Sequence, residues 1–386
     1  MLDSGPHFNL RGWAMTFPKF TIGIEEEYQI VHPETRELTS YIQEFLDSGR
    51  IVLKDQIKPE FLQSQVEVGS RICTSMQQAR SEIYRLRHEV SKLAEEKGLR
   101  VAAAGTHPFT SWTTQQVTAG ERYTKHEENM ADVARQMLVF GMHVHIGIDD
   151  PELLIDIMNQ VRYFLPHLLA LSTSSPFWHG RETGLKSYRT IILGNLPRAG
   201  IPPAFGSWPE YQKFVETLVR TNCIDEATKI WWDIRPNPKY PTLEFRFPDV
   251  CPLVDEVICI ASLLLGLVAK LIKLREANIQ WRNYRRNLLA ENKWRAVRYG
   301  IHGKLLDLGK QREVPLRSLV LELLELLDDV VDELGIRKEV EYVHTILDGG
   351  TSADRQLAVY HSSRDLRAVM DHIIAETSRR PDDVQV

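Results

Sequence analysis

The residues of this chain best suited to chemistry are acidic side chains that alternate with apolar ones near the N-terminus. Residues 20–31 predict a β-strand with one apolar face, formed by Ile22, Ile24, Tyr28 and Ile30. Because successive side chains of a strand point to opposite faces, Glu25 and Glu27 project together from the other face. Two carboxylates this close repel each other unless a cation or a proton lies between them. Glu26 falls among the apolar residues and needs a partner of its own.

The same alternation recurs in residues 142–148 and 242–247. In both segments the apolar residues keep to one face, and the opposite face carries His143, His145, Glu244 and Arg246. Antiparallel sheets commonly have one buried and one polar face. The three segments therefore predict a sheet whose polar residues line a shared cleft. Taken alone, each pair has a plainer interpretation: a solvated carboxylate face, a structural pair of histidines, or an ion pair.

Together these side chains are suited to binding a metal ion and a phosphate. Carboxylates and imidazoles without thiolates favour Mg²⁺ or Mn²⁺, and the two histidines leave zinc open although no HExxH motif is present. Phosphoryl transfer also needs a positive group for the developing charge, which Arg246 beside Glu244 could supply. The chain contains neither GxxxxGK[ST] nor GxGxxG, so an ATP site would have to be built on the sheet itself.

Composition limits the class of protein. With 386 residues, 43% of them hydrophobic, the chain can bury a sizeable core. The formal net charge of −5 argues against nucleic acid as a partner. The four cysteines form no CxxC pair, so we expect buried thiols in a reducing compartment. No secretory signal is visible, and the apolar stretch at 257–269 is too short to span a bilayer. A cytoplasmic protein without membrane contact is predicted, and a homodimer is one option for its assembly.

The other elements alternate irregularly with the strands. Helical periodicity is found at residues 77–97, 152–171 and 211–219 and almost throughout after residue 253. Loops rich in proline are expected at residues 196–209 and 235–241. This order favours an α+β fold over a doubly wound parallel sheet. We expect residues 1–16 to be an N-terminal extension that could be disordered, and residues 17–386 to form a single catalytic domain with a helical C-terminal part.

Taken in order, several segments resemble the YbdK-type carboxylate–amine ligases, also described as the glutamate–cysteine ligase 2 family. The matching segments are Gly-Ile-Glu-Glu-Glu at 23–27, Val-Glu at 66–67, Gly-Thr-His-Pro-Phe at 105–109, Glu-Arg-Tyr at 121–123, Phe-Gly-Met-His-Val-His-Ile-Gly at 140–147, Ser-Tyr-Arg at 187–189, Trp-Asp-Ile-Arg-Pro-Asn-Pro at 232–238, Leu-Glu-Phe-Arg at 243–246 and Arg-Tyr-Gly at 298–300. The resemblance covers roughly residues 18–375 and is specific because so many segments match in the same order.

The resemblance implies ATP-dependent amide formation between a carboxylate, typically the γ-carboxyl of glutamate, and an amine such as that of cysteine. In this family ATP phosphorylates the carboxylate, and the amine then displaces phosphate from the acyl phosphate. The implied fold is related to that of glutamine synthetase: a curved antiparallel sheet with helices packed outside. The implied cofactors are ATP and Mg²⁺ or Mn²⁺. A metal-dependent hydrolase and a non-catalytic relative that binds a nucleotide or an amino acid are the alternatives.

The resemblance also assigns roles to single residues. The matched metal-binding positions are Glu25, Glu27, Glu60, Glu67, His143 and Glu244. Arg246 matches an arginine that faces phosphate, so it is expected to act in catalysis with Glu244 and to bind ATP. The implied substrate-binding residues are Arg189, which would hold a carboxylate, together with His145 and Tyr123. Two positions depart from the family pattern, Gln63 where an acid is expected and Ser70 where threonine is usual, and both could alter the fit of the substrate.

Overall fold

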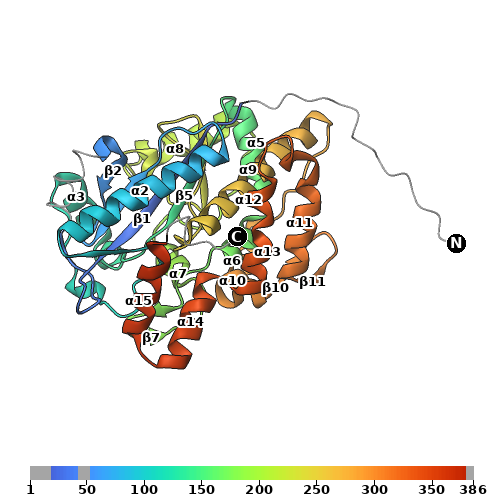
Figure 1. Cartoon of the computed structure of the whole chain (residues 1–386). Helices are drawn as coiled ribbons and strands as arrows, with labels where there is room; N and C mark the ends of the chain where they lie inside the picture. The colour runs from blue at the N-terminus through green and yellow to red at the C-terminus, as the bar shows by residue number, and fades with distance from the viewer. Residues whose placement is uncertain (1–18, 42–52, 380–386) are drawn as a thin grey trace.

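The computed structural model describes residues 19–41 and 53–379. The predicted N-terminal extension at 1–16 lies outside the described residues. The centre of the fold is a seven-stranded sheet in the order β2-β3-β1-β5-β9-β8, with β4 also paired to β1 (Figure 1). Its strands are β1 (Ile22–Val31), β2 (Ile57–Pro59), β3 (Gln65–Gly69), β4 (Arg100–Ala102), β5 (Met142–Gly147), β8 (Ile234–Pro236) and β9 (Thr242–Phe245). All pairs in this sheet are antiparallel, and together with the surrounding helices they confirm the predicted α+β fold.

The register of the sheet places the predicted polar residues opposite one another. Glu25 pairs with His143, Glu27 with Glu67, and His145 with Glu244. Residues directly opposite in an antiparallel pair point to the same side of the sheet. The strands identified by alternation therefore share one polar face, as predicted.

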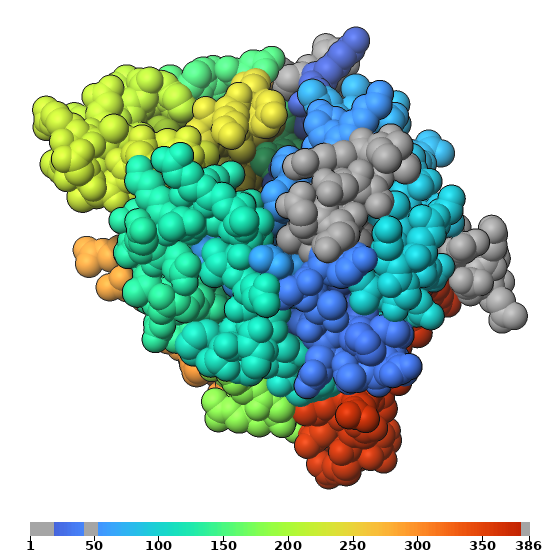
Figure 2. All heavy atoms as spheres, turned by 90° about the vertical axis from the view of Figure 1, so that its left-hand side faces the viewer, coloured from blue at the N-terminus to red at the C-terminus, as the bar shows by residue number. Residues whose placement is uncertain are grey.

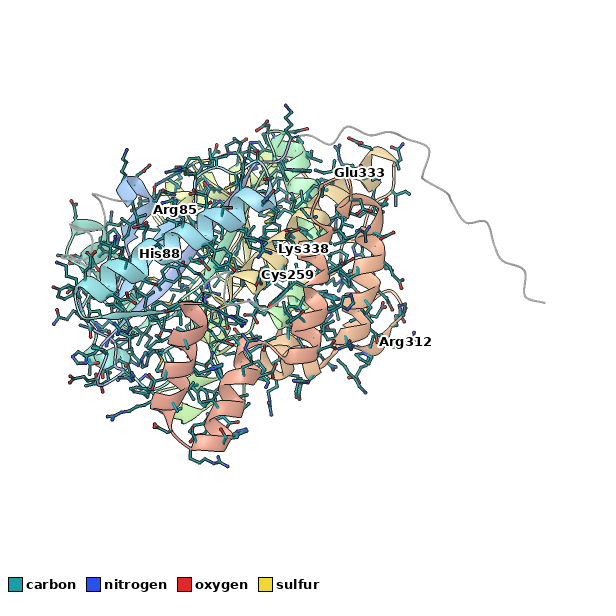
Figure 3. All side chains as sticks on the ribbon, viewed as in Figure 1. Arg85, His88, Cys259, Arg312, Glu333 and Lys338 are labelled. Carbon is teal, nitrogen blue, oxygen red and sulfur yellow. The ribbon has the colours of Figure 1, made fainter. Side chains whose placement is uncertain are left out.

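Helices cover the apolar face of the sheet. The helices in contact with the sheet include α2 (Met76–Glu96), α5 (Pro151–Val161) and α9 (Val254–Glu276). The first begins at the N-cap Ser75, whose side chain accepts a hydrogen bond from the N–H of Gln78, and Gly98 follows its end with a positive φ of 70°. Figure 3 shows Cys259 in the interior on α9, whereas Arg85 and His88 lie on the outer face of α2.

The core helix α9 is unusually apolar. Among the described residues it is the one helix long and apolar enough to cross a membrane, but its apolar window is completely buried inside the protein. This burial confirms the predicted core helix at 257–269 and is typical of a helix at the centre of a soluble protein.

The remaining elements surround this framework. The other helices are α3 (Glu121–Met130), α4 (Asp132–Arg135), α6 (Leu165–Leu171), α7 (Tyr188–Gly194), α8 (Trp208–Arg220), α10 (Arg286–Tyr299), α11 (Leu316–Val331), α12 (Arg337–Glu341), α13 (Val343–Gly349), α14 (Ser352–Ser363) and α15 (Leu366–Thr377). Two hairpins are formed by β6 (Phe177–Trp178) with β7 (Arg181–Glu182), and by β10 (Lys304–Asp307) with β11 (Arg312–Pro315). The last two helices pack on each other, and α15 returns to the sheet, where it packs on β4.

The structure corrects several local predictions. The helical region expected at 152–171 is confirmed but consists of two helices, because Pro166 has no N–H for a continuous helix and disfavours helical geometry before it. The loop expected at 235–241 contributes the edge strand β8, which can contain Pro236 because edge strands tolerate proline. The hairpin β10–β11 interrupts the helical C-terminal part. Cys223 is exposed, unlike the other cysteines.

Candidate active site

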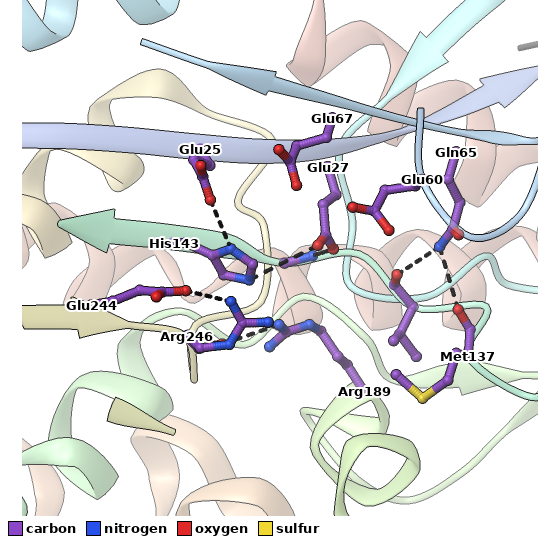
Figure 4. Close-up of polar contacts among 12 residues, drawn as sticks. Glu25, Glu27, Glu60, Gln65, Glu67, Met137, His143, Arg189, Glu244 and Arg246 are labelled. Atoms are coloured by element: carbon purple, nitrogen blue, oxygen red, sulfur yellow. Dashed lines mark hydrogen bonds and ion pairs between the residues drawn. The ribbon is translucent and has the colours of Figure 1, made fainter. Parts of the chain in front are cut away.

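Three carboxylates meet on the polar face (Figure 4). Glu27 of β1, Glu67 of β3 and Glu60, which directly follows β2, each place one oxygen within 4.8 Å of the others. We call these three residues the acid cluster. Burial raises the pKa of all three side chains, and repulsion from neighbouring carboxylates raises it further. The fold therefore concentrates negative charge at a cost in stability, as expected of a site that takes a cation.

The two histidines of β5 contact the neighbouring Glu25. Its Oε2 lies 3.2 Å from Nδ1 of His143 and 3.5 Å from Nε2 of His145. Although burial acts in the opposite direction, hydrogen bonds with these histidines hold the pKa of Glu25 well below its ordinary value. Burial, assisted by Arg246, lowers the pKa of His143 to about 4. In a neutral His143 that donates from Nδ1, the lone pair of Nε2 faces Oε1 of Glu27 at 3.9 Å, and these two acceptors repel each other unless a cation or a proton lies between them.

Glu244 lies apart from the acid cluster, among cations. Arg235, directly opposite on β8, binds it with two hydrogen bonds: Nε to Oε2 at 2.9 Å and Nη2 to Oε1 at 3.1 Å. Nδ2 of Asn237 donates to Oε2 at 2.9 Å, and Arg246 donates to Oε1. Burial opposes ionisation, but Arg246 and Arg235 lower the pKa of Glu244 strongly. In this arrangement the carboxylate aligns Arg246, which directly follows β9, within the polar face.

Arg189 is buried beside Arg246 and is held by the main chain. Its Nη1 donates to the carbonyl of Phe247 and its Nη2 to the carbonyl of Arg246, both at 3.1 Å, while Nε has no hydrogen-bond partner among the described residues. A Cβ at Gly141 would lie 2.1 Å from Nη2, so the close approach of the guanidinium requires glycine there. The N–H of Gly141 donates to Glu27 at 2.5 Å. Gly141 therefore lies next to both Glu27 and Arg189.

The remaining predicted substrate-binding residues make structural contacts. The hydroxyl of Tyr123, on α3, donates to the carbonyl of Pro59 at 2.8 Å, and burial together with Glu60 raises its pKa to about 12. Tyr123 therefore attaches α3 to β2 beside the acid cluster. Nδ1 of His145 lies 3.2 Å from Oγ1 of Thr242, and Glu25 raises the pKa of His145 despite burial.

The two departures from the family pattern serve the main chain in this structure. Oγ of Ser70 accepts from the N–H of Ile24 at 3.0 Å and donates to the carbonyl of Arg71 at 2.8 Å. Nε2 of Gln63 donates to the carbonyl of Val117 at 3.1 Å.

Sequence reasoning missed three residues that contact the site: Lys58, Arg235 and Asn237. Nζ of Lys58 is 2.9 Å from Oε1 of Glu67 and 3.5 Å from Oε1 of Glu25. Burial alone would lower the pKa of Lys58, but Glu67 and Glu25 raise it above its ordinary value. Pro236 and Pro238, which flank Asn237, suggested a loop and concealed the strand that contains Arg235. Arg235 and Asn237 nevertheless lie within the matched segment at 232–238.

The polar face is partly accessible to solvent, since the side chains of Glu25 and Arg246 are 26% and 21% exposed. Figure 2 shows a hollow between the yellow, teal and blue segments of the chain. The acid cluster consists of hard oxygen donors without thiolates, so its residues fit a divalent cation such as Mg²⁺ or Mn²⁺. The adjacent guanidinium groups of Arg246 and Arg189 fit an anion. The geometry can therefore hold a cation and an anion side by side.

Known proteins match this chain over almost its whole length. A protein of Roseiflexus castenholzii provisionally named glutamate–cysteine ligase 2 is 55% identical over 361 residues, which are 94% of this chain and 95% of that protein. A protein of Chloroflexus aggregans with the same provisional name is 55% identical over 358 residues, 93% of this chain and 92% of that protein.

Solved structures show the same fold at low identity. The glutamate–cysteine ligase of Francisella tularensis, solved in complex with AMP, has a TM-score of 0.69 and 14% identity over 94% of this chain and 90% of that one. A bifunctional glutathione synthetase of Pasteurella multocida has a TM-score of 0.68 and 16% identity over 94% of this chain and 53% of that one. The family model described as glutamate–cysteine ligase family 2 matches residues 21–372. The chain therefore belongs to glutamate–cysteine ligase family 2.

Proposed function

We propose that the protein is an ATP-dependent carboxylate–amine ligase that joins the γ-carboxyl of glutamate, or a similar carboxylate, to an amine such as that of cysteine. The observation that carries this proposal is the acid cluster beside Arg246 and Arg189 on one polar face. Membership of the family supports the ligase class. We further infer a cytoplasmic enzyme that acts on small molecules.

The reaction would proceed through an acyl phosphate. A carboxylate oxygen of the first substrate attacks the γ-phosphorus of ATP, and the bond to ADP breaks. The amine then attacks the acyl carbon, phosphate leaves with the former carboxylate oxygen, and the amine nitrogen loses a proton. Each turnover thus converts one ATP, one carboxylate and one amine into ADP, phosphate and the amide.

We assign the cation to polar side chains of β1, β3, β5 and β9, together with the residue that follows β2. The proposed metal-binding residues are Glu25, Glu27, Glu60, Glu67, His143 and Glu244. When bound, Mg²⁺ or Mn²⁺ would neutralise the oxygens of the phosphates. Glu244 would contribute chiefly by orienting Arg246, since its oxygens already accept hydrogen bonds from Arg235, Asn237 and Arg246.

The arginines would supply the charges that the reaction needs. Arg246, aligned by Glu244, would donate hydrogen bonds to the transferring phosphoryl group, whose negative charge grows in the transition state. Arg189 has an unpartnered Nε among the described residues and would bind a substrate carboxylate. His145 and Tyr123 would border the substrate, with the hydroxyl of Tyr123 holding β2 in place.

The decisive experiment measures the release of ADP and traces the oxygen atoms of the substrate carboxylate. A screen of carboxylate and amine pairs with ATP and Mg²⁺ or Mn²⁺ should find a pair that releases ADP only when both substrates are present. With ¹⁸O in the carboxylate of that pair, the label should appear in the released phosphate. ADP release with no amine and unlabelled phosphate would mean that water attacks ATP, and the enzyme would be a hydrolase. ATP binding without turnover of any pair would identify a non-catalytic relative.

A further inference from the structure

The half-exposed lysine Lys58 stands at the entrance of the acid cluster. It lies on the edge strand β2, directly opposite Glu67 in the register, with its ammonium 2.9 Å from Oε1 of Glu67 and 3.5 Å from Oε1 of Glu25. Its side chain is 50% exposed, whereas those of Glu67 and Glu25 are 12% and 26% exposed. Among the residues that the structure describes, Lys58 is the one cation that forms an ion pair with Glu67.

The backbone of Lys58 is fixed while its side chain can move. The carbonyl of the next residue, Pro59, accepts the hydroxyl of Tyr123, and the strand pairs on both sides of Lys58 with β3. The side chain itself ends in a compact ammonium on four rotatable methylene groups, and half of it faces solvent. A side chain of this kind can leave two carboxylates without any rearrangement of the sheet.

A divalent cation at this site would need the oxygen that Lys58 now contacts. Oε1 of Glu67 cannot sit close to both an ammonium and a doubly charged ion without strong repulsion between the two cations. We propose that Lys58 is an internal counter-ion of the acid cluster, which neutralises Glu67 and Glu25 when no metal is bound and is displaced when Mg²⁺ or Mn²⁺ binds. The inference rests on the proposed metal site and assigns to Lys58 the control of its affinity.

Two consequences follow from this exchange. The metal-free protein avoids the full repulsion of its carboxylates, so the site can be preorganised before metal arrives. The metal must also displace one positive charge, so its affinity is weaker than the bare carboxylates would give. Replacing the ammonium with an uncharged side chain of similar length should therefore destabilise the metal-free protein and tighten metal binding.

The test measures Mn²⁺ binding to the full-length, nucleotide-free protein by electron paramagnetic resonance. We expect Lys58→Met to tighten the Kd for Mn²⁺ about tenfold, the scale of losing one competing charge at a partly exposed site. Lys58→Arg should stay within about threefold of the wild type, because it retains the charge. Lys54→Met removes a lysine from the neighbouring exposed segment and should also change the Kd by less than about threefold, since solvent screens its charge.

Thermal unfolding provides the second measurement. In EDTA, Lys58→Met should unfold at a lower temperature than the wild type, and Mg²⁺ should raise its Tm more than it raises that of the wild type. Lys58→Gln serves as a second neutral variant if the methionine protein does not fold. A Kd for Mn²⁺ that is unchanged or weaker in the neutral variants overturns the inference, and so does an absence of Mn²⁺ binding in both wild type and variants. Neither result depends on ADP release, so a failure of the proposed ligase activity would be recognised separately.

Discussion

At the scale of single residues, the carboxylates of the polar face fall into two electrostatic groups. Glu25 and Glu244 are paired with histidines or arginines, which lower their pKa against the effect of burial. Glu27, Glu60 and Glu67 have raised pKa values because burial, together with repulsion from neighbouring carboxylates that include Glu25, outweighs their favourable contacts. The first group is stable as it stands, whereas the second group needs a cation. In the acid cluster, the carboxylates that suit cation binding therefore lower the stability of the metal-free protein.

The first prediction concerns Glu60, whose pKa is raised well above its ordinary value by burial and by Glu67 and Glu27. A raised pKa means that the ionised form is less stable in the folded state than in the unfolded one, so ionisation at pH 8 lowers stability. In EDTA, Glu60→Gln should raise the free energy of unfolding by about 1 kcal/mol. Urea denaturation measures this change, with the exposed Glu34→Gln as a control that should have little effect.

Adding Mg²⁺ should reverse the order of stability, so that the wild type becomes more stable than Glu60→Gln. The wild type should gain more stability than Glu60→Gln, because the variant has lost one of its oxygen ligands. A variant that is less stable than the wild type in EDTA would show that Glu60 is a structural residue.

The second prediction concerns Arg246, whose hydrogen bonds to the phosphoryl group should strengthen in the transition state. Arg246→Ala should lower kcat by about 10²–10³, the usual effect of removing one preorganised donor, while the Kd for ATP changes little. Glu244 keeps Arg235 and Asn237 as partners, so the variant should remain folded. Arg246→Lys retains the charge but not the planar fork and should recover only part of kcat. Equal losses in kcat and ATP affinity would assign Arg246 to ground-state binding instead.

At the scale of elements, a buried ion pair joins the central strand to the helix that covers it. Glu26 of β1 accepts from Nε of Arg87 on α2 at 3.0 Å, and both side chains are buried. Nη2 of Arg87 also donates to the carbonyl of Cys251 at 2.7 Å, just before α9. This is the partner that Glu26 was expected to need. The pair fixes the position of β1, and with it the direction of Glu25 and Glu27.

The third prediction tests this connection. Arg87→Met should lower the free energy of unfolding by about 3–5 kcal/mol, because it leaves the carboxylate of Glu26 buried without its cation. The double variant Glu26→Gln with Arg87→Met should recover part of that loss, since no uncompensated charge remains. Urea denaturation of the three proteins provides the measurement. A loss below about 1 kcal/mol in the single variant would mean that water reaches Glu26 and that the pair does not hold the two elements together.

A second connection depends on His107, in the matched segment at 105–109. Its ring is completely buried, with Nε2 2.8 Å from the carbonyl of Arg36 and Nδ1 accepting from the N–H of Thr110 at 3.0 Å. Burial lowers the pKa of His107 to about 3. The ring therefore joins two loops in its neutral form, as donor to one and acceptor from the other.

The fourth prediction is a pH dependence with a defined sign. In the unfolded chain this histidine gains a proton near pH 6.5, whereas in the folded protein it does so only near pH 3. Between these values the unfolded state binds more protons, so stability falls as the pH is lowered. From pH 7.5 to 5.0 His107 should account for about 2 kcal/mol of lost stability. His107→Gln should reduce the loss by about that amount in urea titrations, and replacement of the exposed His88 should not.

At the scale of the whole molecule, segments distant in the chain complete one core. The C-terminal helix α15 packs on β4, and the hydroxyl of Thr377 accepts a hydrogen bond from the N–H of Ala103 at 3.0 Å. Arg355 of α14 pairs with Glu256 of α9 and with Glu376 of α15. The helical C-terminal part therefore supports the sheet that carries the acid cluster, and a single domain over residues 17–386 stays a prediction.

The fifth prediction follows from this support. Calorimetry of the whole chain should show one cooperative transition, and removal of residues 364–386 should prevent stable folding. The truncation exposes the apolar surface covered by Val369, Met370 and Ile373, each of which is completely buried. Two separate transitions in the full chain would contradict the single domain, as would a truncated protein that retains the cooperative unfolding of the whole.

The sequence by itself determined which residues share a face. The side-chain period of a strand is two, so Glu25 and Glu27 must project together, and His143 and His145 likewise, whatever the rest of the chain does. Local signals also located α2 and the core helix α9 closely. Segments matched in order indicated the family, and this prediction was confirmed.

Only the tertiary structure decided which charges meet. Lys58 contacts Glu67 because of the register of an edge strand, and Arg235 binds Glu244 because a segment rich in proline became β8. Glu26 required a cation, but helix packing selected Arg87, 61 residues further along the chain. Periodicity is a local property of the backbone, whereas these pairs depend on register and packing between segments far apart in sequence. A single sequence therefore shows which carboxylates need partners, and the assembled sheet and helices supply them.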